Sequence, residues 1–100
     1  MDQLFERLSI GYPHPDTHEY VLTYAEVLCA LSHIGSHLDT VILGGDVLDD
    51  EDHHTYMNWY YQRNETLTMA KNARLSCDQA MQYITNLPNP QLYRYILVLN

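Results

Sequence analysis

Residues 44–56 have the sequence Gly-Gly-Asp-Val-Leu-Asp-Asp-Glu-Asp-His-His-Thr-Tyr, and the interpretation of the rest of the chain depends on them. The two glycines favour the end of a helix, because glycine adopts the left-handed C-cap conformation without a steric penalty. The acids that follow favour the start of another helix, because carboxylates in a first turn complement the helix dipole. The segment therefore predicts an acidic corner between two helices.

The segments on both sides of this corner have the periodicity of amphipathic helices. Residues 16–43 begin with Asp16 and Glu19 at capping-box spacing, and apolar side chains then recur every three or four residues. Residues 49–86 carry a row of small side chains, Ala70, Ala73, Cys77 and Ala80. Because small residues let helices approach closely, the two long helices are expected to pack as an antiparallel hairpin.

Both ends of the chain are expected to add a short helix. Leu4, Phe5 and Leu8 would share one side of a helix over residues 2–9. Residues 91–99 follow an Asn-Pro cap signal; their aromatic and branched residues also suit a strand, but a lone strand would lack a partner. We therefore predict one all-α domain over residues 1–100: an antiparallel helical hairpin with short N- and C-terminal helices, completed by oligomerisation.

The charge distribution indicates a protein partner. The net charge is -8, and no Lys or Arg occurs from Leu8 to Gln62. Such a surface repels nucleic acid and favours a basic protein surface. Nine tyrosines add side chains that suit interfaces. The expected partner-binding residues combine the acids and aromatics of the corner: Asp46, Asp49, Asp50, Glu51, Asp52, Tyr56, Trp59 and Tyr60. The alternative is that the acids only keep the protein soluble.

No catalytic motif is evident. The segment Asp39–Asp49 resembles the Gly-Asp-x-x-Asp segment of metallophosphoesterases, which implies two-metal hydrolysis. That chemistry needs ligands from several strands of a much larger α/β sandwich, for which 100 residues are too few. The serines lack a nucleophile elbow, and no glycine-rich phosphate loop precedes a helix. We expect neither enzymatic activity nor a cofactor.

The leading functional prediction is a non-enzymatic protein that binds and blocks a basic protein surface, including one that normally accepts nucleic acid. In size, acidity and lack of motifs it resembles phage-encoded inhibitors of host defence or replication proteins. Residues 1–7 lack the features of a secretory signal, and no segment is long and apolar enough to span a bilayer. The expected location is therefore the cytoplasm, with no membrane partner.

Two alternatives belong to other functional classes. Arg63, Lys71 and Arg74 are candidates for gripping nucleotides or cyclic nucleotides at an oligomer interface, beside Tyr56 and Tyr60. His33 and His37 stand four residues apart on an expected helix, a spacing that suits zinc in a metal-binding helical module.

Overall fold

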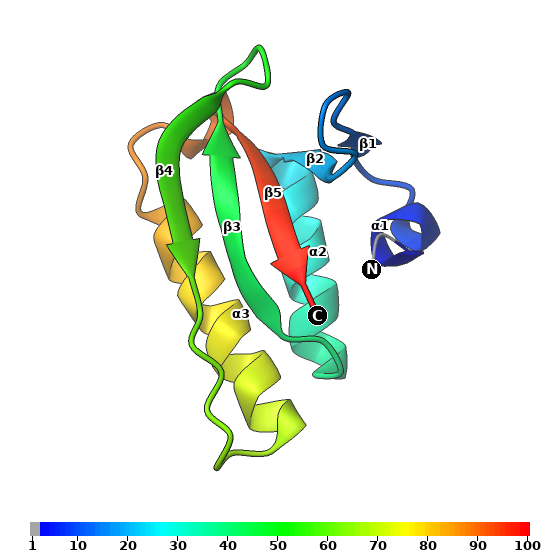
Figure 1. The fold of residues 1–100 in the computed structure, drawn as a ribbon, viewed down its shortest axis with the longest axis vertical. Coiled ribbons are helices and arrows are strands. Elements are labelled where there is room, and N and C mark those ends of the chain that lie inside the picture. The colour runs from blue at the N-terminus through cyan, green and yellow to red at the C-terminus, as the bar shows by residue number, and fades with distance from the viewer. Residues whose placement is uncertain (1–2) are drawn as a thin grey trace.

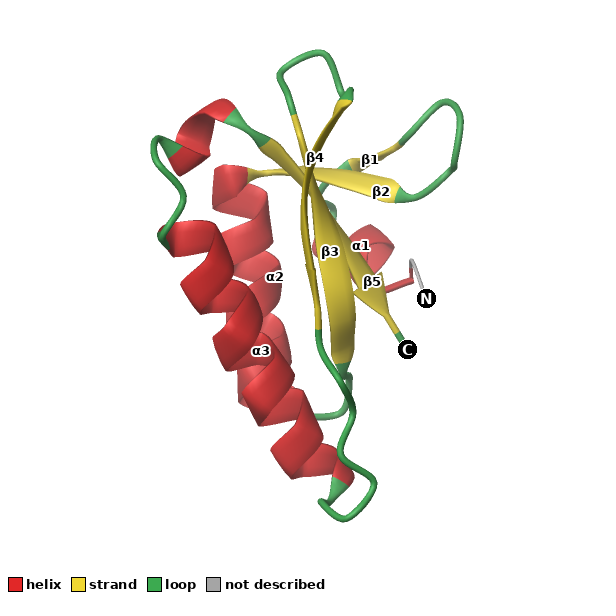
Figure 2. Cartoon of the chain, turned by 60° about the vertical axis from the view of Figure 1, so that its left-hand side comes forward, coloured by secondary structure: helices red, strands yellow, loops and turns green. Residues whose placement is uncertain are grey.

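A five-stranded antiparallel sheet forms the centre of the molecule, and two helices cover one of its faces (Figures 1 and 2). A computed structural model describes residues 3–100. The helices are α1 (Gln3–Leu8), α2 (Tyr24–His37) and α3 (Met69–Thr85), with a 3-10 turn, η1 (Pro90–Leu92). The strands are β1 (Tyr12–Pro13), β2 (Tyr20–Thr23), β3 (Ile42–Leu48), β4 (His54–Tyr60) and β5 (Arg94–Leu99). Their order across the sheet is β1-β2-β5-β3-β4.

The prediction of an all-α helical hairpin is wrong. Residues 16–43 hold β2, α2 and the start of β3, and residues 49–86 hold β4 before α3. Residues 91–99 contain the end of η1 and the whole of β5, and not the expected helix. β5 pairs with both β2 and β3, so the objection that a strand here would lack a partner fails. The short N-terminal helix is present as α1, although residue 2 lies outside the described part of the chain.

The glycine pair lies inside β3 and does not cap a helix. Gly45 faces Trp59 across the β3–β4 pair, and a β-carbon there would collide with the Trp59 ring and meet the Ile96 carbonyl oxygen at 2.5 Å. A β-carbon on Gly44 would collide with the backbone of β4. Without side chains, Gly44 lets the backbone of β4 approach β3 closely, and Gly45 leaves room for the Trp59 ring. Glycine inside a strand often marks such a close approach.

The main core lies between the sheet and the two long helices. Val47, Trp59, Tyr95 and Leu97 contribute from the sheet. The helices contribute small and branched side chains, among them Val27, Ala30, Leu31, Ile34, Cys77, Ala80 and Ile84. Of the predicted row of small residues on α3, Ala73, Cys77 and Ala80 are buried and Ala70 is exposed. The Cys77 thiol donates a hydrogen bond to the Leu31 carbonyl oxygen of α2 at 3.3 Å.

The helix α2 begins with a capping box built from Thr23 and Glu26. The Glu26 N–H donates to the Thr23 hydroxyl at 3.2 Å, and the Thr23 N–H donates to Oε1 of Glu26 at 2.9 Å. Oε2 of Glu26 also accepts the Gly11 N–H at 3.0 Å, which ties the loop before β1 to this helix. The Asp16–Glu19 pair has the same spacing but starts no helix.

Glu26 should make stability depend on pH. Burial raises the pKa of this carboxyl, but the N–H groups of Thr23 and Gly11 and the nearby Arg94 charge outweigh burial, so the pKa lies below its usual value of 4.5. A depressed folded-state pKa stabilises the protein above pH 4.5, and this contribution disappears as the pH falls through the folded-state pKa. In urea titrations from pH 7 to pH 3, Glu26→Gln should flatten the decline of unfolding free energy. An unchanged slope would contradict this role.

Candidate functional site

The turn between β3 and β4 carries four consecutive acids, Asp49, Asp50, Glu51 and Asp52, which we call the acidic turn. Asp49 organises it: Oδ1 accepts the N–H groups of Glu51 at 2.8 Å and His53 at 2.9 Å. These bonds from His53 and Glu51 lower the pKa of Asp49. The acids therefore belong to a tight turn between two strands.

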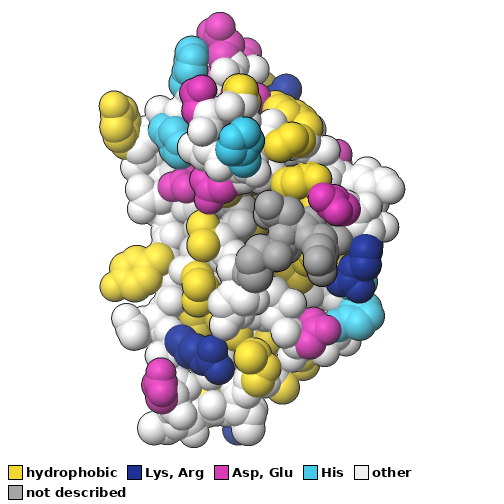
Figure 3. All heavy atoms as spheres, turned by 45° about the vertical axis from the view of Figure 1, so that its right-hand side comes forward, with side chains coloured by type: hydrophobic (Ala, Val, Ile, Leu, Met, Phe, Trp, Pro, Cys, Tyr) yellow, Lys and Arg dark blue, Asp and Glu magenta, His cyan; other side chains and the backbone are white. Residues whose placement is uncertain are grey.

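Among the described residues, the acidic turn has two basic neighbours: His53 lies beside Asp49, and Arg94 lies near Tyr12, whose hydroxyl bonds Asp52. Nδ1 of His53 lies 3.7 Å from Oδ2 of Asp49, with both side chains well exposed. Within residues 3–100, no Lys or Arg forms a salt bridge with these carboxylates. Figure 3 shows acidic and histidine side chains gathered at the top of the molecule, where this turn lies in Figure 1. The turn consequently presents an excess of negative charge to an approaching molecule.

The acidic turn is fixed to the connection between β1 and β2. The Tyr12 hydroxyl donates to Oδ2 of Asp52 at 2.5 Å. The Asp16 N–H donates to Nδ1 of His14, so Nε2 carries the proton that is donated to the Asp52 carbonyl oxygen at 3.1 Å. The backbone of Asp52 has a φ of 63°, which is in the left-handed region. These contacts hold the acids in one arrangement, which reduces the entropy lost on binding.

The strand β4 presents two of the predicted tyrosines to solvent. Tyr56 is 93% exposed and Tyr60 71% exposed. The pairing of β4 with β3 shifts register between Asp46 and Leu48, and Tyr56 adopts φ 68 within this irregular part of the strand. A tyrosine with positive φ is uncommon, and such local strain often marks a functional position. We call the acidic turn together with Tyr56 and Tyr60 the acidic-tyrosine surface.

Asp46 and Trp59 occupy different places. Asp46 is half-buried on the sheet face away from α2 and α3, where it pairs in register with Asn58 and Ile96. Trp59 is only 7% exposed, and its ring lies 4.9 Å from that of Tyr83 on α3. Trp59 therefore packs in the core and contributes nothing to the exposed surface. The sequence signal that could have revealed this is the alternation of apolar Met57 and Trp59 with the more polar Tyr56, Asn58 and Tyr60, which is typical of a strand.

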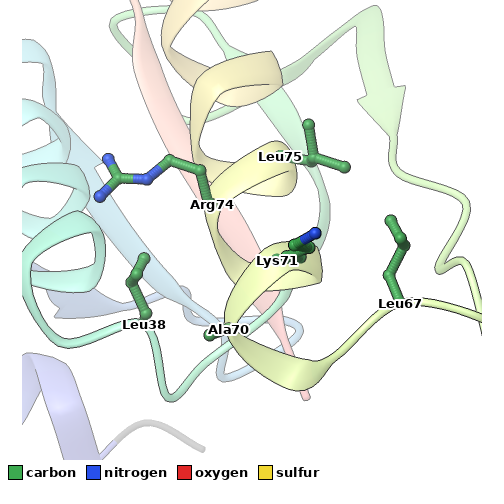
Figure 4. Close-up of a pocket in the computed structure, with 6 residues that line it drawn as sticks. All are labelled: Leu38, Leu67, Ala70, Lys71, Arg74 and Leu75. Atoms are coloured by element: carbon green, nitrogen blue, oxygen red, sulfur yellow. The ribbon is translucent and has the colours of Figure 1, made fainter.

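The bases predicted for a nucleotide site are only partly brought together. Lys71 and Arg74 line a groove with Leu38, Leu67, Ala70 and Leu75 (Figure 4). Neither Arg63 nor the tyrosines of β4 line this groove. Nη2 of Arg74 donates to the Gly35 carbonyl oxygen at 3.3 Å, close to the C-terminal end of α2, where a cation is favoured.

The predicted histidine pair is present on α2. The rings of His33 and His37 stack with centroids 4.1 Å apart, and Nδ1 of His37 lies 2.9 Å from the His33 carbonyl oxygen. Over residues 3–100, no three His, Cys, Asp or Glu side chains are placed to share a metal ion.

The same residues include no helix with the length and apolar character needed to cross a bilayer.

Comparison with known proteins gives one family. Residues 8–100 match the model of the family described as Immunity protein 40. No curated protein and no solved structure matches the chain. An immunity protein inhibits a toxin by binding it, which agrees with the prediction of a non-enzymatic protein that binds a partner protein. Because the match covers nearly the whole sequence, the chain belongs to the Immunity protein 40 family.

Proposed function

We propose that this protein neutralises a toxin by binding it through the acidic-tyrosine surface and covering a basic face of the toxin. The observation that carries this proposal is the acidic turn, whose carboxylates have no Lys or Arg partner within residues 3–100. Uncompensated charge of one sign accelerates encounter with a surface of the opposite sign. The basic face would be one that grips nucleic acid phosphates, and the proposed location of the complex is the cytoplasm.

The tyrosines would supply the apolar part of the contact. Tyrosine is enriched among the residues that dominate interface energies, because it buries a large rigid ring and keeps a polar hydroxyl. Tyr56 lies close to the acidic turn, and Tyr60 lies at the far end of the same strand, so aromatic area extends from the charged turn along β4. In such an interface, the acidic side chains would attract the basic toxin surface, and the aromatic side chains would pack against it.

The partner would contact side chains and not extend the sheet. β4 is an edge strand of the described sheet, and an exposed edge invites pairing with another strand. However, the Tyr60 carbonyl oxygen already accepts a hydrogen bond from Nε2 of Gln79 at 2.9 Å. The irregular pairing around Tyr56 also bends the strand away from regular ladder geometry.

Reversing exposed charges of the acidic turn tests the proposal. Asp50 and Glu51 are suitable because both are exposed and their carboxylates take no part in the hydrogen bonds that hold the turn. We expect Asp50→Lys with Glu51→Lys to slow association with the toxin by on the order of 10- to 100-fold at low salt. The dissociation rate should change little, and the difference should shrink as salt rises.

The measurement first requires the toxin to be co-purified with this protein from its host, identified by mass spectrometry and prepared alone. Surface plasmon resonance over a salt series then gives both rate constants. Asp39→Lys with Glu65→Lys is the matched control, because it makes the same charge change at exposed positions outside the acidic-tyrosine surface. Equal slowing in both variants would reject the site. A short oligonucleotide that failed to compete for the toxin would reject the nucleic-acid-binding face.

A further inference from the structure

A cleft lies between the acidic turn and the connection from β1 to β2. Figures 1 and 2 both show these two loops beside each other at one end of the molecule. One wall is formed by residues 14–16 and the other by residues 51–54. The volume is about 300 Å³, at the lower end of the range of small-molecule sites. The cleft therefore has room for a single side chain of a partner.

Both walls of the cleft carry carboxylates. Asp16 belongs to one wall, and Glu51 and Asp52 belong to the other. No hydrogen bond or salt bridge of the Asp16 or Glu51 carboxylate is found within residues 3–100. Oδ1 of Asp52 is buried and has no hydrogen-bond partner in the same part of the chain. A carboxylate oxygen removed from water without a partner is unfavourable, and a cationic donor bound against Asp52 would relieve this cost.

No Lys or Arg of the described chain lines the cleft. Its remaining lining residues are Pro15, His14, His53 and His54. The His14 ring is 6% exposed and uncharged, because Nδ1 accepts the Asp16 N–H while Nε2 donates to the Asp52 carbonyl oxygen. Arg94 lies near Tyr12 but outside the lining. The cleft is therefore complementary to a cation that comes from another molecule.

The arrangement suits an organic cation better than a metal ion. Among the described residues, no three His, Cys, Asp or Glu side chains converge closely enough to hold a metal. A guanidinium group is planar and has five N–H donors, so it can bond to acceptors on two walls that are too far apart to share a metal ion. It also stacks on flat rings, and the rings of His14 and His54 lie here with centroids 6.5 Å apart. The ammonium group of lysine has neither property.

We infer that this cleft receives an arginine side chain of the toxin, with the guanidinium between Asp16 on one wall and Glu51 and Asp52 on the other. The inference rests on the proposed toxin binding and names the toxin group that is bound. The exposed charges of the acidic turn attract the toxin, and the cleft then holds one of its arginines. The hydrogen bonds from Tyr12 and His14 to Asp52 keep the two walls together before the toxin arrives, which reduces the entropy lost on binding.

The cleft can be tested without the toxin. Blocked arginine (N-acetyl-arginine amide) is titrated into the full chain and followed by NMR, with the blocked amides of lysine and citrulline as comparisons. Citrulline keeps the shape of arginine without its charge, and lysine keeps the charge without the planar head. Arginine should shift the N–H signals of residues 14, 16 and 51–54 with a dissociation constant on the order of 1–10 mM. Lysine should bind more weakly by about threefold or more, and citrulline should not saturate.

Two double variants separate the cleft from general negative charge. Asp16→Asn with Glu51→Gln removes one carboxylate from each wall and none of the hydrogen bonds that hold the loops, and it should weaken arginine binding about tenfold. Asp50→Asn with Glu65→Gln makes the same chemical change at exposed positions outside the lining, and binding should stay within about twofold of the wild type. Equal weakening in the two variants, or shifts spread evenly over the surface acids, would show ion attraction only and overturn the inference.

Rate constants with the purified toxin show whether the toxin supplies the arginine. Asp16→Asn should speed dissociation about tenfold and leave association within about twofold of the wild type. Reversal of Asp50 and Glu51 is split into single variants, because only Glu51 lines the cleft. If attraction were the only effect, neither variant would change dissociation; with an arginine in the cleft, Glu51→Lys should also speed dissociation by about threefold or more.

The single variants also distinguish the two proposals. Slower association of Asp50→Lys together with unchanged dissociation of Asp16→Asn and Glu51→Lys would reject the arginine cleft and leave the acidic-tyrosine surface in place. Unchanged association of Asp50→Lys, in a chain that still binds blocked arginine through Asp16, would reject the role of the acidic turn in attracting the toxin and leave the cleft in place.

Discussion

Gly45→Ala is expected to lower the free energy of unfolding by about 3 kcal/mol. The added methyl group would collide with the Trp59 ring and meet the Ile96 carbonyl oxygen at 2.5 Å, so β3, β4 and β5 would all have to shift. Backbone cannot move away as cheaply as the end of a flexible side chain. Urea unfolding followed by Trp59 fluorescence gives the free energy, and far-ultraviolet circular dichroism provides a second probe.

Gly35→Ala is the matched control for this prediction. A β-carbon on Gly35 would lie 3.5 Å from the Cys77 sulfur, which is an ordinary contact, and the position is inside α2. Alanine in a helix interior is favoured over glycine, so this variant should gain roughly 0.5–1 kcal/mol. Substitution of glycine by alanine should therefore lower the free energy of unfolding at position 45 and raise it at position 35. Equal losses at both positions would show that Gly45 has no special role in packing the sheet.

Replacing Tyr56 with glycine is expected to separate binding from stability. The side chain is 93% exposed, so its loss removes little packing, and glycine adopts φ 68 without the penalty that tyrosine incurs. The free energy of unfolding should rise by up to about 1 kcal/mol. If Tyr56 anchors the toxin, affinity should fall by about 2 kcal/mol or more, which is on the order of 30-fold.

The two effects are measured on the same protein preparation, by urea unfolding and by calorimetric titration of the purified toxin. Tyr56→Phe is the conservative control, because it keeps the ring and the backbone conformation and should retain most of the affinity. Simultaneous loss of stability and affinity would indicate that Tyr56 supports the fold. Gain of stability without loss of affinity would remove Tyr56 from the interface.

The sequence predicts the helices better than the strands. The small residues of α3 were placed on a packing face, and Ala73, Cys77 and Ala80 are buried there, whereas Ala70 is exposed. The capping box that starts α2 was also visible as Thr23-x-x-Glu26, but an identical spacing at Asp16 and Glu19 competed with it. Local signals define a helix only when one candidate start is clearly better than the others.

The strands required information that no local window holds. β5 is stabilised by pairing with β2 and β3, and Ile42 pairs with Leu99 from the far end of the chain. Once β2 had been assigned to a helix and most of β3 to the corner between two helices, β5 had no neighbour left to pair with. The acids of residues 49–52 suit a first helical turn and a strand-connecting turn equally well, so their composition did not distinguish between the two.

The position of β5 in the sheet affects how the protein is made. β5 lies between β2 and β3 but follows both in the chain, so a nascent polypeptide cannot complete this sheet until residues 94–99 have left the ribosome. Until then, β2 and β3 lack the strand that pairs with both of them, and their edges stay unpaired. For a member of an immunity family, the delay between translation and protection therefore includes the emergence of its central strand.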